Sequence, residues 1–240
     1  MSAAARVRRV VTTREGGVSR QPYASFNLGH HVGDTPDAVA ANRARLAEGV
    51  GLAPERLVWM EQVHGRTVVV VDGPRDEPVP ATDGLVTAVR GLAVVVLVAD
   101  CVPVLLADPV AGVVAAVHAG RVGARVGVLP AVLEAMQRAG ADIGAVEALL
   151  GPAACGSCYE VPADMRAAVE THLPGSGCRT RRGTPGLDLR AGLWRQLADA
   201  GVARVGVDPR CTLEDPALFS YRREGTTGRF AALTWIEPGP

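Results

Sequence analysis

The chain has 240 residues with 25 basic and 25 acidic side chains, so its formal net charge is zero. This balance gives no general electrostatic reason to bind nucleic acid or an anionic membrane. A hydrophobic content of 48% with 21% charged residues excludes a disordered chain. Length and composition therefore predict a single globular domain over residues 1–240.

Short β-branched segments fill the first half of the chain and are predicted to be strands. They cover the ranges 7–13, 57–62, 67–71, 92–99, 102–107 and 113–118. Several are apolar at every position, which indicates a sheet that is covered on both faces.

Four helices are predicted from capping residues and helical spacing. The first begins at Thr35-Pro36, where a cap precedes proline, and ends at Gly51. The other three are expected in the ranges 122–139, 163–172 and 190–200. Strands crowd together first and helices follow, which favours an α+β fold with mixed β-sheets covered by helices.

Two segments interrupt this pattern. Gly127 and Pro130 are expected to delay or kink the second helix. The range 179–186 is polar and rich in glycine, and it is expected to form a loop.

The most apolar stretch, 91–107, contains Asp100 and Pro103 and does not qualify as a membrane span. The first six residues have no apolar core of a signal peptide. Five scattered cysteines are poor material for a disulfide framework and suit a reducing compartment. We expect a soluble, cytoplasmic and monomeric protein with no membrane or nucleic-acid partner.

Three residues could form a metal site. His64 follows the predicted strand 57–62, His118 ends the predicted strand 113–118, and Cys101 lies between them in the most hydrophobic part of the chain. A thiolate and two imidazoles make a three-ligand set for zinc and leave a fourth position for water or substrate. Copper suits the same donors, so the residues do not select the metal. Singly, each is commoner as a structural residue.

The turn after residue 107 decides whether Cys101 and His118 share a face of the sheet. A two-residue loop places them opposite each other, and a four-residue loop leaves them diagonal on one face. A three-residue loop puts them on opposite faces. Two of these registers bring the thiol and the imidazole within about 5–8 Å. Asp100, next to Cys101, either orients a ligand or is exposed in a turn.

A series of short motifs runs along nearly the whole chain. It includes Asn27-Leu28-Gly29, Asn42-Arg43, Gln62-Val63-His64-Gly65, Asp83-Gly84-Leu85, Asp100-Cys101-Val102-Pro103, His118-Ala119-Gly120, Tyr159-Glu160-Val161 and Phe219-Ser220-Tyr221-Arg222-Arg223. In this order the motifs resemble the YfiH family, also called the multicopper polyphenol oxidase or laccase-like domain family.

The resemblance implies a single α+β domain with mixed sheets, a fold likened to that of a toxin deamidase. It implies a metal site of His64, Cys101 and His118, with catalysis centred on Cys101 and His118. The implied chemistry is zinc-dependent phosphorolysis of adenosine, inosine, guanosine and methylthioadenosine, together with deamination of adenosine. Purine nucleoside and phosphate would be the substrates.

Three other hypotheses stay open. An older description of the family makes it a copper-dependent oxidase of polyphenols, although five histidines cannot also supply the separate cluster of a true multicopper oxidase. A metal-free cysteine hydrolase would use Cys101 as nucleophile and His118 as base. A binding module would carry out no chemistry.

Two residues are candidates for binding the substrate. Phosphorolysis needs an anion site, for which Arg43 is the candidate, and Asn27 is a candidate to hydrogen-bond the ribose or the base. The family usually continues its last histidine motif as His-Ala-Gly-Trp-Arg-Gly, but Arg121 and Val122 follow Gly120 here. Arg121 would therefore have to replace the family arginine from a neighbouring direction.

The remaining cysteines are left outside the predicted site. Cys155 and Cys158 form a lone Cys-x-x-Cys pair with no second pair at ribbon spacing, so they are interpreted as packing residues near a loop. Cys178 and Cys211 carry no partner signature.

Overall fold

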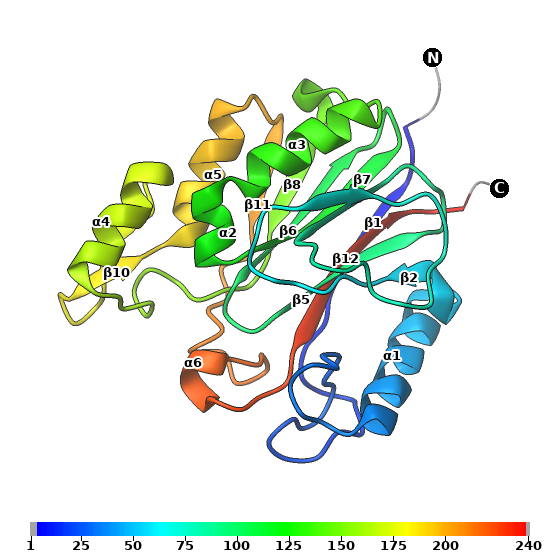
Figure 1. Ribbon diagram of the computed structural model, residues 1–240, viewed down its shortest axis with the longest axis horizontal. Helices are drawn as coiled ribbons and strands as arrows, with labels where there is room; N and C mark the ends of the chain where they lie inside the picture. The colour runs from blue at the N-terminus through cyan, green and yellow to red at the C-terminus, as the bar shows by residue number, and fades with distance from the viewer. Residues whose placement is uncertain (1–3, 239–240) are drawn as a thin grey trace.

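The computed structural model describes residues 4–238, in which two β-sheets pack face to face and helices cover their outer faces (Figure 1). The signal-peptide prediction for the first six residues falls partly on residues 1–3, which lie outside the described residues. The mixed α+β fold predicted from the sequence is confirmed.

The larger sheet has six strands in the order β11-β8-β6-β7-β4-β3. Their bounds are β3 Val68–Val70, β4 Gly84–Thr87, β6 Val102–Asp108, β7 Val113–Ala119, β8 Glu147–Leu150 and β11 Arg204–Val207. The pairs β3–β4 and β8–β11 are parallel and the others are antiparallel. The sheet is therefore mixed.

The smaller sheet has four strands in the order β1-β12-β5-β2. Their bounds are β1 Val7–Val11, β2 Leu57–Val58, β5 Ala93–Val98 and β12 Phe230–Ile236. The two ends of the chain lie side by side in this sheet, since β12 is antiparallel to both β1 and β5. The predicted range 57–62 is a strand only at its first two residues. Beyond them, Met60 forms an isolated bridge to Val79.

Six α-helices complete the described fold. They are α1 Pro36–Val50, α2 Arg121–Val126, α3 Val128–Arg138, α4 Ala163–His172, α5 Leu189–Asp199 and α6 Tyr221–Glu224. The predicted start and end of α1 are confirmed, with Gly51 at φ 70° closing the helix. Gly127, at φ 90°, divides the range 122–139 into two helices. Pro130 lies in the first turn of α3, where proline is tolerated.

One predicted loop is a hairpin. Strands β9 Gly177–Arg179 and β10 Pro185–Leu187 pair antiparallel, so the range 179–186 is a loop only between them. The prediction was wrong at both ends because two paired strands of three residues leave no periodic signal in the sequence.

Alternation along β5 builds two separate cores. Ala93, Val95 and Leu97 face α1 and its neighbours, and they belong to the cluster Phe26, Leu28, Leu46, Ala47, Leu57, Trp59, Ala93, Val95, Leu97, Ala231, Leu233 and Trp235. Val94, Val96 and Val98 face the six-stranded sheet. The expectation that strands apolar at every position lie in a covered sheet is therefore confirmed.

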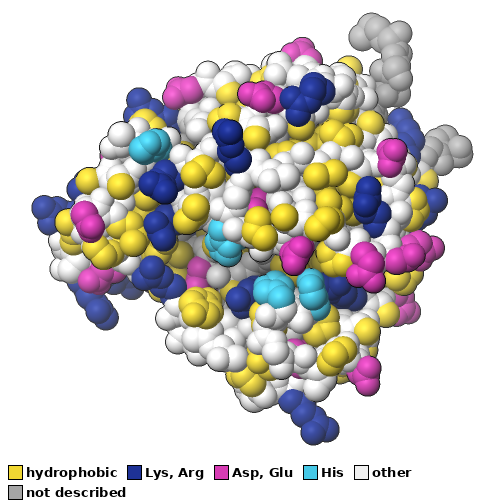
Figure 2. Space-filling view, viewed as in Figure 1, with side chains coloured by type: hydrophobic (Ala, Val, Ile, Leu, Met, Phe, Trp, Pro, Cys, Tyr) yellow, Lys and Arg dark blue, Asp and Glu magenta, His cyan; other side chains and the backbone are white. Residues whose placement is uncertain are grey.

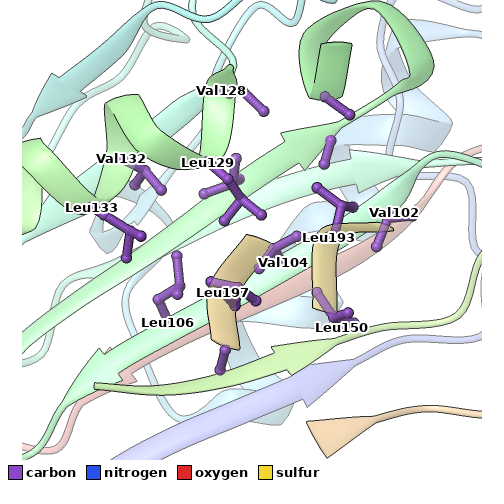
Figure 3. Close-up of a cluster of buried hydrophobic side chains, with 14 of the residues drawn as sticks. Val102, Val104, Leu106, Val128, Leu129, Val132, Leu133, Leu150, Leu193 and Leu197 are labelled. Carbon is purple, nitrogen blue, oxygen red and sulfur yellow. The ribbon is translucent and has the colours of Figure 1, made fainter. Parts of the chain in front are cut away.

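A third core lies on the outer face of the six-stranded sheet. Figure 3 shows side chains of α3 and α5 meeting those of β6, among them Leu129, Val132, Leu197, Val104 and Leu106. Burying each such side chain contributes about 1.5–3 kcal/mol. The layers therefore follow the order helix, four-stranded sheet, six-stranded sheet and helices. Because both sheets are packed on both faces, the positions of their strand ends are fixed by the core.

Within residues 4–238, the structure contains no helix with the length and hydropathy needed to cross a bilayer.

Candidate metal centre and adjoining cavity

Four neighbouring strands of the large sheet bring the predicted metal ligands to the same end of the sheet. Cys101 directly precedes β6, His118 is the penultimate residue of β7, and His64 lies shortly before β3. The strands lie in the order β6-β7-β4-β3, and their directions place these three positions at the same end. Residues far apart in the sequence thus converge without long loops.

Of the three registers considered for β6 and β7, the structure has the one in which a four-residue loop joins the two strands. Pro103 pairs with His118 and Asp108 pairs with Val113, which leaves Cys101 diagonal to His118 on one face. The candidate ligand atoms of His64, Cys101 and His118 all lie within 4.8 Å of one another. The Cys101 Sγ is 3.9 Å from His64 Nε2, and the two imidazole rings meet edge to face at 4.6 Å. The structure therefore brings all three predicted metal ligands together.

A buried carboxylate holds both histidines. Asp83 Oδ1 lies 2.8 Å from His118 Nδ1 and accepts the His64 amide at 2.9 Å. Its Oδ2 accepts the amides of Val63 and Gly65 at 3.3 and 2.6 Å. Because Nδ1 of His118 is engaged, its Nε2 is left to face the other donors. The sequence analysis treated Asp83 only as part of a motif and gave it no role.

Asp100 does not take the ligand-orienting role considered for it. Its carboxylate accepts hydrogen bonds from Thr212 Oγ1 and Ser220 Oγ, both at 2.6 Å, and from the Arg222 amide at 2.7 Å. Asp100 has a φ of 92°, which is strained for a residue with a side chain. The three hydrogen bonds offset that strain, so Asp100 fixes the backbone that presents Cys101.

Gln62 fixes the segment that carries His64. Its Nε2 donates to the Leu97 carbonyl at 2.7 Å, and its Oε1 accepts the Leu97 amide at 2.8 Å. The side chain therefore pairs with β5 as another strand would, and His64 follows two residues later.

The electrostatics of the site favour a thiolate. Burial opposes ionisation of Cys101, but the His118 and His64 imidazoles outweigh it and lower the pKa of the thiol to about 6. Burial also disfavours the charged form of His118, yet Cys101 and Asp83 raise the pKa of its imidazole to about 9. A thiolate is the form of cysteine that binds metals and attacks electrophiles.

The donor set and the space around it fit a metal ion. One sulfur and two imidazole nitrogens match the ligands of zinc sites that keep a position for substrate. A Cβ on Gly120 would lie 2.8 Å from His64 Cδ2 and 3.1 Å from Cys101 Sγ. Glycine at this position therefore keeps the space beside the donors clear.

The donors open into a cavity of about 390 Å³. This volume is within the range of small-molecule sites. Figure 2 shows histidine side chains in and beside a hollow near the centre of this face. The other polar and aromatic lining residues are His31, Gln62, Asp100, Arg121, Tyr159, Tyr221, Arg222 and Arg229. Three guanidinium groups and two phenol rings thus face the same space as the metal donors.

The cavity arginines differ in how they are held. Arg222 lies over the Tyr159 ring at 4.5 Å and donates to the Glu160 carbonyl at 3.0 Å. Arg229 donates to the carbonyls of residues 227 and 228, both at 3.0 Å. In the described part of the chain, no hydrogen bond or ion pair engages the Arg121 guanidinium, which leaves it available to an anion.

Both predicted substrate-binding residues need correction. Asn27 is fully buried, and its Oδ1 accepts the Arg229 amide at 2.9 Å. It therefore positions Arg229 and cannot reach a ribose. The Arg43 guanidinium lies over the Trp59 ring at 4.0 Å, and its Nε donates to the Leu28 carbonyl at 3.0 Å. It lines a different depression, because its face of α1 packs against the small sheet.

Three cavity residues belong to motifs seen in the sequence but were not predicted to be part of the site. Tyr159, Tyr221 and Arg222 all lie in quoted motifs, but no spacing rule connects them to Cys101. Asp100 is the connection, because it binds the segment that carries residues 220–222.

The fold and the site together define a class of protein. It is a mixed α+β protein with a His-Cys-His donor set at one end of the strands of its larger sheet. The chain belongs to the family described as multi-copper polyphenol oxidoreductase laccase, whose profile matches residues 8–237. The YfiH resemblance seen in the sequence is thereby confirmed.

Relatives and solved structures agree with this placement. A Corynebacterium glutamicum protein named purine nucleoside phosphorylase is 60% identical over 232 residues, covering 96% of this chain and 94% of that protein. A Mycobacterium tuberculosis protein of the same name is also 60% identical, with coverage of 97% and 93%. The crystal structure of YlmD from Geobacillus stearothermophilus has a TM-score of 0.91 at 35% identity, with coverage of 97% and 92%.

Proposed function

We propose that this chain is a zinc-dependent purine nucleoside enzyme. Its reactions would be phosphorolysis of adenosine, inosine, guanosine and methylthioadenosine, and deamination of adenosine. The observation that carries this proposal is the presence of a metal donor set, three arginines and two tyrosines in one cavity. The name purine nucleoside phosphorylase, given to relatives at 60% identity, supports the choice of substrate.

Phosphorolysis exchanges one bond for another at the ribose. An oxygen of phosphate forms a bond to C1′, the bond from C1′ to the base nitrogen breaks, and its electron pair leaves with the base. The base then takes up a proton, and ribose 1-phosphate is the second product. Deamination instead replaces the 6-amino group of adenosine by the oxygen of water and releases ammonia.

The arginines suit the phosphate. A guanidinium binds phosphate oxygens through two parallel hydrogen bonds and keeps its charge at every accessible pH. Arg121 has its guanidinium available, while Arg222 and Arg229 are fixed by carbonyls and add positive charge to the same space.

The aromatic and histidine residues suit the nucleoside. Tyr159 and Tyr221 offer flat apolar faces to a purine. Partial burial and the nearby Arg229 lower the pKa of His31 to about 4, so its ring is uncharged at neutral pH. An uncharged imidazole can donate one hydrogen bond to the base and accept another.

His64, Cys101 and His118 would hold the zinc ion at the end of this cavity. When bound, zinc supplies Lewis-acid polarisation of a substrate atom. Asp83 would keep the His118 imidazole oriented toward the ion and fix the backbone that carries His64. We propose zinc as the resident metal, and copper is the alternative that the same donors allow.

We further propose that residues 1–240 act as one domain, as a cytoplasmic monomer. The family profile over residues 8–237 supports one domain. All five cysteines are free thiols, which supports a reducing compartment.

A product analysis tests the function. Metal-defined protein is incubated with adenosine and phosphate, and adenine, inosine and hypoxanthine are separated. We expect adenine together with ribose 1-phosphate, and inosine from the parallel deamination. If none of these products forms while metal analysis finds the ion bound, the nucleoside proposal is wrong.

The low thiol pKa also favours a second candidate, a metal-free cysteine hydrolase with Cys101 as nucleophile and His118 as base. That enzyme would have no need of His64 as a ligand. A chelator distinguishes the two, because it should stop the zinc enzyme and leave the hydrolase active. A visible thiolate-to-copper absorption band would instead indicate the copper oxidase.

Arg121→Gln is expected to raise the KM for phosphate about tenfold, because a charged hydrogen bond contributes about 1.5 kcal/mol or more. The KM for adenosine should change little. Steady-state kinetics at varied phosphate measure this, with Arg125→Gln, an exposed arginine on the same helix, as the matched control. Equal phosphate KM values in the two variants would remove Arg121 from the anion site.

A further inference from the structure

A second cluster of metal-binding side chains lies outside the site described above. The ligand atoms of Cys155, Cys158, Cys211 and Glu214 all lie within 4.8 Å of one another. Cys155 and Cys158 belong to the loop between β8 and α4, and Cys211 and Glu214 to the loop between β11 and α6. We propose that this cluster is a structural zinc site, with three thiolate ligands and Glu214 as the fourth.

The distances suit a tetrahedral ion. With Zn–S bonds of about 2.3 Å, two thiolates of a tetrahedral site lie about 3.8 Å apart. The observed upper limit of 4.8 Å exceeds this by roughly an ångström, which is a small adjustment for side chains in loops. Four protein ligands also complete the coordination, as in zinc sites that stabilise folds.

The backbone around the thiols is arranged to support ligands. The Cys155 amide donates to Cys211 Sγ at 3.4 Å. The amides of Cys158 and Tyr159 both donate to the Cys155 carbonyl, at 3.0 and 2.9 Å, and so form a tight turn. An isolated parallel bridge joins Ala153 to Cys211 and sets the two loops side by side. The turn directs both thiols of the Cys-x-x-Cys pair toward the third.

The charges of the cluster can be balanced when an ion binds. A divalent ion would displace the thiol protons, and the resulting thiolates would bind it directly. Glu214 already pairs with Arg181, whose positive charge would offset part of the negative charge of three thiolates and a carboxylate.

The site would brace one wall of the substrate cavity. Tyr159 directly follows Cys158 and faces the cavity, where Arg222 lies over its ring. Arg222 belongs to the chain segment that follows Cys211, so the ion would tie together the two loops that meet in this stacked pair. The sequence predicted Cys155 and Cys158 to be packing residues, because no second Cys-x-x-Cys pair lies at ribbon spacing, and Cys211 stands alone 53 positions after Cys158.

Metal stoichiometry tests the proposal without an activity assay. Reduced, metal-stripped protein is titrated with zinc, and bound zinc is counted. We expect two equivalents in the unmodified chain and one in Cys211→Ser or in the double variant Cys155→Ser/Cys158→Ser. Cys178→Ser is the matched control and should keep two, since its thiol donates to the Gly156 carbonyl outside the cluster.

Cobalt in place of zinc counts the thiolates. The variant His64→Ala disables the first site, and it should bind one cobalt ion with the strong near-ultraviolet absorption of several thiolate ligands. This measurement does not depend on the cysteine variants folding. It is also separate from the proposed function: if the first site binds no metal, the unmodified chain holds one equivalent that His64→Ala keeps and Cys211→Ser loses.

Two results would overturn the proposal. One is a single zinc equivalent that disappears in His64→Ala and persists in Cys211→Ser. The other is a disulfide between Cys155 and Cys158 that dissolved oxygen forms even in the presence of excess zinc, detected as a loss of two free thiols.

Discussion

Replacing Cys101 with alanine is expected to lower the turnover of adenosine by at least about a thousandfold. The thiolate is the charged donor of the His64, Cys101 and His118 set. Without it, two neutral imidazoles hold a divalent cation weakly. Steady-state assays and metal analysis of the same preparation should therefore show losses of both activity and one zinc equivalent.

The control for this prediction is Cys178→Ala, a partly buried cysteine of the β9–β10 hairpin. It should keep both activity and metal. If Cys101→Ala retained half of the normal turnover, or the same zinc content as the control, the reacting centre would lie elsewhere in the molecule.

The variant Asp83→Asn is expected to lose activity about 10- to 100-fold and to unfold about 10 °C lower. The carboxylate accepts three backbone amides and faces His118 Nδ1, and it is fully buried. The side-chain NH2 group of asparagine would face backbone N–H groups that donate to the carboxylate in the unmodified chain. Leaving these buried N–H groups without an acceptor costs about 3 kcal/mol. Steady-state turnover and a thermal unfolding curve measure the two effects.

Asp142→Asn serves as the comparison for Asp83. Asp142 is exposed and accepts one amide, that of Gly144, at 3.0 Å. Asparagine caps such a turn about as well as aspartate, so its melting temperature and activity should stay unchanged. Equal melting temperatures in the two variants would contradict a supporting role for Asp83.

The strands that the sequence predicted are the ones with continuous β-branched residues. Ranges such as 92–99 and 113–118 lie within a residue or two of β5 and β7, since long apolar runs carry their own signal. β12 was missed although it is fully buried, because its segment Phe230–Ile236 has only two β-branched residues and they are not consecutive. Its strand character comes from pairing with β1, more than 200 residues earlier.

The site was predictable as far as its donors and no further. Cys101 and His118 could be related through the short turn between β6 and β7, which is a local property of the sequence. Asp83 could not, because its partner His64 lies 19 positions earlier, before β3, and its partner His118 lies 35 positions later, on β7. Arg43 was misplaced for a related reason: a helix pattern as weakly amphipathic as that of α1 does not show which of its faces meets the protein interior.

Neighbouring strands of the large sheet each position one part of the candidate metal centre, and this has a consequence for which ions it would hold. Strands in a sheet lie about 4.8 Å apart, and their hydrogen bonds resist any widening of that interval. Calcium needs six to eight oxygen atoms around it, which three nitrogen and sulfur atoms anchored to such a lattice cannot provide. Discrimination among cations would then follow from the donor atoms and from the sheet that spaces them, so changes in the surrounding loops could alter the choice of substrate without altering the choice of ion.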